Sequence, residues 1–181
     1  MILGHNVDSV TGYAKRRQSG VSHGDRVPGH GLMPTWSKLY QLLENGGVDL
    51  ADCFFTNVFV GLKVGDRNEG RFTAHPTIEF SRWCREFLAY QVRVMRPRVV
   101  VVLGQHACVD LAEVVTPTPW SARPFPPPMV VDAQLFGWQT ALVPVRHPSR
   151  SNRISLDAMS IGAAWGARND DGQTCSSCPR D

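Results

Sequence analysis

The sequence predicts an α/β fold, a three-layer αβα sandwich with a central, mostly parallel sheet of four strands. Residues 99–103 are five consecutive aliphatic residues followed by Gly104, which is typical of a strand buried on both faces. Residues 78–95 precede that strand and carry apolar side chains at helical spacing. The other segments alternate between strand and helix patterns, which is the order that produces a parallel sheet.

The elements are predicted in chain order as follows. Residues 1–3 begin the first strand, and GHNVDS (4–9) follows it as a polar segment. Thr35 can cap a helix over 35–45, and the two glycines after Asn45 can end it. Then come a strand at 52–60, the helix at 78–95, the strand at 99–103, a helix at 106–115, a strand at 138–145 and a helix at 151–167. Residues 11–31 and the proline-rich segment 117–128 are predicted to be irregular.

The length of 181 residues fits one domain, which we expect over 1–168, with 169–181 as a disordered polar tail. No apolar run is long enough to cross a bilayer, and no signal-peptide pattern precedes the first strand. We therefore expect a cytoplasmic monomer without membrane association. The net charge of +3 allows a polyanionic partner but does not require one.

The five cysteines do not form a recognisable metal motif. Cys53, Cys84 and Cys108 lie in apolar or helical contexts and are expected to be buried free thiols, as in a reducing compartment. Cys175 and Cys178 form a single CxxC pair, whereas a structural zinc site needs four ligands. We predict no metal at any of these positions.

Polar side chains stand at the ends of the predicted strands, where parallel sheets bind their ligands. They are Asn6 and Asp8 after the first strand, Asn57 in the second, His106 after the third and His147 after the fourth. Asn and His can read a nucleobase edge, and Asn or Asp can orient a water molecule. A neutral His can also donate a hydrogen bond to a developing negative charge. The set suits hydrolysis of a bond whose leaving group departs as an anion.

Each of these residues also has an ordinary structural interpretation. Asn6 and Asp8 after Gly4 are common turn residues, so GHNVDS can simply end the strand. Asn57 can connect two loops, and the segment from His147 can be a plain helix start. The recurrence of such residues at successive strand ends favours the functional interpretation.

Several motifs resemble those of the uracil-DNA glycosylase superfamily, from about residue 2 to 153. GHNVD resembles the first motif of that family, with Asn6 at the water-activating position. FFTNVFVGL (54–62) resembles its second strand, with Asn57 at the base-reading position, and VRHPSRSN (145–152) resembles its final His-Pro-Ser motif. Residues 27–43 resemble the mismatch-specific branch, whereas residues 84–107 are similar to the thermophilic-type branches.

The resemblance implies an enzyme that flips a base out of duplex or single-stranded DNA and hydrolyses its glycosidic bond. His147 would stabilise the departing base, Asn6 would position water, and Asp8 would assist the water or oppose the cationic sugar. No lysine falls at a motif position, so we expect a monofunctional enzyme that leaves the strand uncut. Contacts to DNA are expected from Ser149, Arg150, Ser151, Asn152, Arg153, Lys15, Arg16 and Arg17.

The chain also departs from the family pattern. Only Cys84 falls near a cysteine of the members that hold an iron–sulfur cluster, so no cluster and no other cofactor is predicted. Val7 and Asp8 replace the Pro and the Gly or Tyr of the first motif. Val27 stands where an aromatic residue normally stacks on the base. Tyr13 is expected to take over that stacking, with His5 also facing the base.

These departures predict a base pocket open to a large 5-substituent. We expect a modified pyrimidine as the target, such as a hypermodified phage base, which would make the protein a defence enzyme. A conventional uracil or mismatch repair enzyme is the alternative. Two further alternatives are a catalytically silent DNA- or nucleotide-binding module and a hydrolase of free nucleosides.

Overall fold

The structure is a computed structural model that describes residues 1–18, 34–63, 78–117, 129–148 and 154–170. Eleven regular elements and two short 3-10 turns, Leu50–Asp52 and Ala112–Val114, occur in these ranges. The helices are α1 (Val10–Gln18), α2 (Pro34–Asn45), α3 (Ile78–Met95), α4 (Gln105–Leu111) and α5 (Ile154–Asp170). The strands are β1 (Ile2–Ser9), β2 (Phe55–Lys63), β3 (Val99–Leu103), β4 (Val115–Thr116), β5 (Val131–Leu135) and β6 (Trp138–Val145).

The strands form one sheet in the order β2-β1-β3-β6-β5-β4. The first four are mutually parallel and coincide with the four predicted strands, whereas β5 and β4 pair antiparallel at the far edge. The prediction of four strands was therefore wrong, and the sheet has six. The added strands are short, and β5 is half-buried, so neither produces the long aliphatic run that identified β3.

A two-residue turn joins β5 to β6. Both residues of the turn, Phe136 and Gly137, have positive φ angles, of 51° and 78°. Such turns match the twist of antiparallel strands and favour a hairpin. The hairpin explains how the chain returns to the sheet after the proline-rich segment and enters β6.

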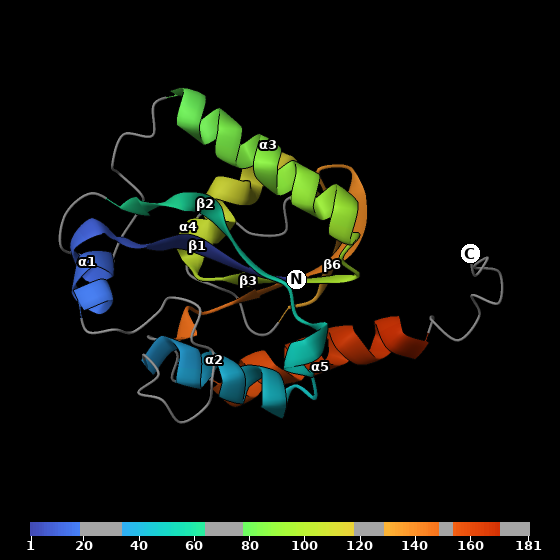
Figure 1. Cartoon of the computed structure of the whole chain (residues 1–181). Helices are drawn as coiled ribbons and strands as arrows, with labels where there is room; N and C mark the ends of the chain where they lie inside the picture. Colours follow the sequence, from blue (N-terminus) through green and yellow to red (C-terminus); the bar gives the residue numbers. More distant parts are fainter. Residues whose placement is uncertain (19–33, 64–77, 118–128, 149–153, 171–181) are drawn as a thin grey trace, which may run out of the picture.

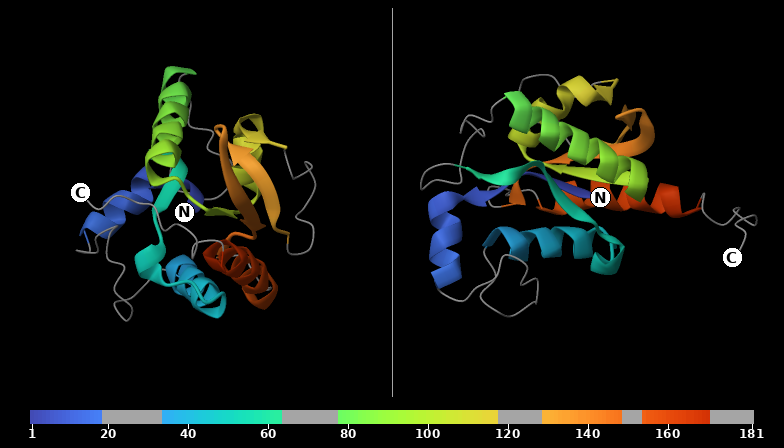
Figure 2. Two further views of the ribbon diagram at one scale, coloured as in Figure 1. Left: turned by 90° about the vertical axis from the view of Figure 1, so that its right-hand side faces the viewer. Right: turned by 45° about the horizontal axis from the view of Figure 1, so that its top comes forward.

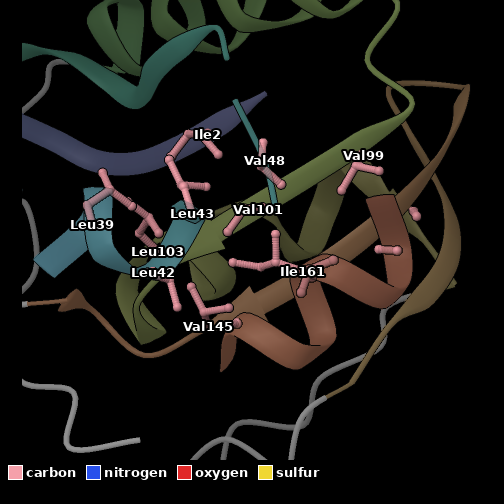
Figure 3. Close-up of a cluster of buried hydrophobic side chains, with 14 residues drawn as sticks. Ile2, Leu39, Leu42, Leu43, Val48, Val99, Val101, Leu103, Val145 and Ile161 are labelled. Atoms are coloured by element: carbon pink, nitrogen blue, oxygen red, sulfur yellow. The ribbon is translucent and has the colours of Figure 1, made fainter. Parts of the chain in front are cut away.

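Helices cover both faces of the sheet, as the sandwich prediction required (Figures 1 and 2). One core lies between the sheet and the pair α2 and α5, and it includes Val99, Val101 and Leu103 of β3 (Figure 3). The second core lies on the side of α3 and α4 and includes Val100 and Val102. Because alternate side chains of β3 enter opposite cores, all five of its residues are aliphatic and buried.

The N-terminal region differs from the prediction in two ways. GHNVDS is not a turn, because β1 continues through it to Ser9 and pairs with β2 along its length. Helix α1 then begins at once, inside a segment predicted to be irregular. The hydroxyl of Ser9 accepts a hydrogen bond from the backbone N–H of Gly12 at 3.1 Å, which caps the helix. The low apolar content of α1 hid this helix from pattern analysis.

The other helix boundaries lie close to the predicted ones. Helix α4 ends at Leu111, and a 3-10 turn replaces the last residues of the predicted helix 106–115. Helix α5 runs to Asp170, two residues into the expected tail, whose remainder lies outside the described residues. No helix in the described part of the chain has the length and apolarity needed to cross a membrane.

Candidate active site

The side chains that the sequence singled out belong to the four parallel strands or to the residues that directly follow them. They are Asn6 and Asp8 in β1, Asn57 in β2, His106 in α4 after β3, and His147 after β6. β1 and β2 pair so that Gly4 stands opposite Asn57 and Asn6 stands opposite Phe59. Between Asn6 and Asp8 the register shifts, since Asp8 pairs with Leu62 and β2 therefore holds one extra residue. Such bulges re-aim neighbouring side chains and are frequent beside active sites.

Asn57 lies directly against the backbone of Gly4. A Cβ atom placed on Gly4 would stand 2.3 Å from Oδ1 of Asn57, closer than any real contact of that kind. Only glycine leaves room for the amide in this position. The glycine of the first motif therefore has a physical role, which is to let the Asn57 side chain lie across β1.

His147 lies against Gly104 in a similar way. Gly104 ends β3 with φ 87°, and its N–H donates to the carbonyl of Val145 at 2.8 Å. A Cβ atom on Gly104 would stand 3.1 Å from Cβ of His147, so the backbone angle and the close approach both favour glycine. The end of β3 thus supports the half-buried residue that follows β6.

His5, which the sequence predicted to face the base, contacts α4 and β2 in the structure. Its Nε2–H donates to Oδ2 of Asp110 at 2.8 Å, because a carboxylate can only accept. Its ring meets Phe59 edge-on with centroids 5.6 Å apart, and the ring of His106 lies 5.4 Å away. His5 is buried, and these contacts direct it towards α4 on the face opposite Gly4.

Asp110 was not among the residues found by sequence reasoning. It lies four residues after His106 on α4, and residues at that spacing share one face of a helix. The spacing is a signal that could have suggested a polar face directed at β1. With Asp110 bonded to His5, α4 fixes the strand that carries the first motif.

The remaining predicted residues are placed only in part. Tyr13 is half-buried on α1, which packs beside β1 and β2. Only the backbone is described for five of them, and it lies in β1 or α1. These five are Asn6, Asp8, Lys15, Arg16 and Arg17. Val27 and the five predicted DNA contacts at 149–153 lie outside the described residues.

Within the described ranges, no three His, Cys, Asp or Glu side chains gather in a way that could hold a metal ion. Cys53, Cys84 and Cys108 are free thiols, and burial raises the pKa of each, in the case of Cys108 to about 12. A thiol with a raised pKa is a poor nucleophile at neutral pH. Among the described residues, the groups available for a reaction are therefore amide, imidazole and carboxylate groups.

Residues 22–165 match the family model described as the Uracil DNA glycosylase superfamily, which covers most of the chain. The matched segment includes Asn57, Gly104 and His147, and it begins after β1. No curated protein matches the chain.

Proposed function

The chain belongs to the uracil DNA glycosylase superfamily, and on that premise we propose that it flips a pyrimidine out of DNA and hydrolyses its glycosidic bond. One observation carries the proposal. Asn57, the third residue of β2, pairs with Gly4, one residue beyond the Leu3–Val102 pair, and so lies level with the ends of β3 and β6. His147 follows β6, and each of the two side chains lies against a glycine. A residue that reads a base edge and one that donates to a leaving group are the minimum that this reaction needs.

The proposed reaction breaks the bond between C1′ of the sugar and the ring nitrogen of the base. The electron pair of that bond leaves with the base, and His147 stabilises the resulting anion by donating a hydrogen bond. A water molecule held by Asn6 supplies the oxygen that bonds to C1′. Its proton passes to Asp8 or to bulk water, so the products are an abasic sugar and the free base.

We propose a 5-substituted pyrimidine as the target, such as a hypermodified phage base, with uracil as the alternative. Support comes from the first motif, where Val7 and Asp8 stand in place of the family residues. Here β1 stays paired with β2 as far as Ser9 and leads straight into α1. The residues that border the base are thus held by strand and helix, with no proline turn at this point. An anti-phage defence role would follow from such a target.

Release of the base from defined duplexes tests both parts of the proposal. Duplexes carrying uracil, 5-hydroxymethylcytosine or its glucosylated form are incubated with the protein, and the free base is identified by mass spectrometry. Asn57→Ala and His147→Ala should each slow release by about 10²-fold or more, as is usual for lost transition-state hydrogen bonds. Asn45→Ala, at the exposed end of α2, is the matched control and should leave the rate unchanged.

The results also separate the alternatives. Release of uracil alone would exclude the 5-substituted target while leaving the glycosylase proposal intact. No release from any duplex would favour a silent binding module. Release from free nucleosides with little dependence on salt would favour a small-molecule hydrolase, because binding to DNA weakens steeply as salt rises.

The monofunctional mechanism has its own test. Lys63 is buried at the end of β2, in register with Ser9, and is the lysine to exclude as a nucleophile. An amine nucleophile forms an imine with C1′ that borohydride reduces to a stable adduct. We expect no trapped protein–DNA adduct from wild type. An adduct that disappears in Lys63→Gln would overturn the monofunctional proposal.

A further inference from the structure

Helix α3 carries apolar side chains beyond those that fill the core beneath it. Cys84, Leu88 and Val92 are buried in the core beneath the helix. A second row runs along one flank of the helix at alternating spacings of three and four residues, and we call it the heptad row. It consists of Phe80, Trp83, Phe87, Tyr90 and Val94. This spacing is the one by which a helix packs against another helix. At the start of the row, Phe80 lies against Gly61 of β2, where a Cβ atom would stand 2.7 Å from the ring.

Three of the five side chains of the heptad row are exposed, whereas Phe80 and Phe87 are half-buried. Trp83, Tyr90 and Val94 are 50%, 54% and 58% exposed. In Figures 1 and 2 no other described helix or strand lies over the outer side of α3. The rings of Trp83 and Phe87 stack with centroids 5.4 Å apart and planes at 1°, and Phe80 stacks on Trp83 at 6.1 Å. Side chains fixed in this way lose little entropy when a partner covers them.

Charges beside the heptad row indicate what that partner is. Glu79, Glu86 and Arg93 follow one another at seven-residue intervals along one flank. If two copies of α3 pack antiparallel, this flank faces the same flank of the other copy, and Glu79 of each lies opposite Arg93 of the other. In a parallel pair the flank would face Cys84 and Gln91, which carry no opposite charge. The charge pattern therefore favours antiparallel pairing.

We propose that two copies of the chain associate through the heptad row, with their α3 helices antiparallel. Glu86 meets Glu86 of the other copy at the two-fold axis, and this like-charge contact weakens the pair. Five side chains a copy are far fewer than the roughly 20–30 residues a side of a standard interface, so the interface is small. We therefore expect a weak dimer, with a dissociation constant on the order of 10–100 µM. The monomer expected from sequence would be the form at low concentration.

Sedimentation velocity over a concentration series tests the association. The mass should rise from 20.0 kDa towards twice that value as the concentration passes the dissociation constant. Trp83→Glu should keep the chain monomeric throughout, with an unchanged circular dichroism spectrum. Met159→Glu is the matched control, because Met159 is 69% exposed on α5, away from the row, and it should dimerise like wild type.

A charge exchange tests the antiparallel arrangement itself. Glu79→Arg and Arg93→Glu alone should each weaken the dimer by about tenfold. Each substitution places two like charges opposite one another at both of the symmetry-related 79–93 contacts. The double variant should return to near the wild-type constant, and Glu86→Gln should tighten the dimer. The proposal would be overturned if the double variant dimerised no more tightly than either single variant. It would also be overturned if the wild type stayed monomeric up to about 500 µM.

A row of stacked rings can also bind unpaired bases. Binding of an oligothymidylate that Trp83→Glu abolishes, with the wild type monomeric at every concentration, would assign the row to nucleic acid and contradict the dimer.

Discussion

Asn57 places its side-chain oxygen over the α-carbon of Gly4, at a point where a Cβ atom would be only 2.3 Å from it. The two residues are register partners on adjacent parallel strands, 53 positions apart in the chain as their numbers show. The first motif and the residue proposed to read the base are thus a single structural unit. A change at Gly4 should act on Asn57.

Gly4→Ala should reduce base release by at least about tenfold, because the methyl group displaces the Asn57 amide from its position. The loss should resemble that of Asn57→Ala, and combining the two should add little, since both remove the same group. Gly166→Ala is the control, because nothing lies within 4 Å of a Cβ at that helical position. It should keep full activity and raise stability by up to about 1 kcal/mol. Full activity in Gly4→Ala would contradict the role given to Asn57.

Asp110→Leu should destabilise the fold by about 1–3 kcal/mol, because it removes the hydrogen-bond acceptor of the buried His5 side chain. Urea denaturation measures the effect. Glu113→Gln breaks the Arg85–Glu113 pair, whose side chains are 51% and 72% exposed, and it should change stability by less than about 1 kcal/mol. Equal effects of the two substitutions would show that the His5–Asp110 contact has no special importance.

Thr140→Val should stabilise the protein by about 1 kcal/mol, because the hydroxyl of Thr140 is buried and has no hydrogen-bond partner among the described residues. Thr56→Val makes the same change on β2, where the hydroxyl donates to Oε1 of Gln91 at 2.9 Å. That variant should lose about 1 kcal/mol. Both substitutions keep a β-branched residue in a strand, so opposite shifts in Tm isolate the hydrogen bond.

Stability should fall at alkaline pH through Cys108, whose pKa burial raises from 9.0 to about 12. Above pH 9 the unfolded chain releases this proton while the folded chain keeps it, so rising pH favours unfolding until the folded pKa is reached. The loss between pH 9 and 10 is about 1 kcal/mol for this thiol. Cys108→Ala should remove that part of the slope in urea titrations at the two pH values. An unchanged slope in the variant would place the alkaline sensitivity elsewhere.

The sequence determined much of the architecture. The aliphatic run at 99–103, the apolar spacing of 78–95 and the alternation of strands with helices are local patterns, and they located the four parallel strands and the helices beside them. They also predicted that Asn57 and His147 lie near one edge of the sheet, because parallel strands share the edge at which they end. In the structure Asn57 is the third residue of β2, and His147 follows the last residue of β6 by two positions. Those two residues fall within the segment that matches the family.

Only the tertiary structure decided the rest, because it depends on contacts between residues far apart in the chain. GHNVDS has the composition of a turn, and pairing with β2 turns it into a strand. His5 was predicted to face the base from its place in the first motif, and its hydrogen bond to Asp110 of α4 is visible only in the structure. β5 has little apolar signal of its own and is a strand because β6 returns beside it. The spacing of apolar and polar residues indicates which side of a helix or strand is buried. Packing between distant segments determines which neighbours each side chain contacts.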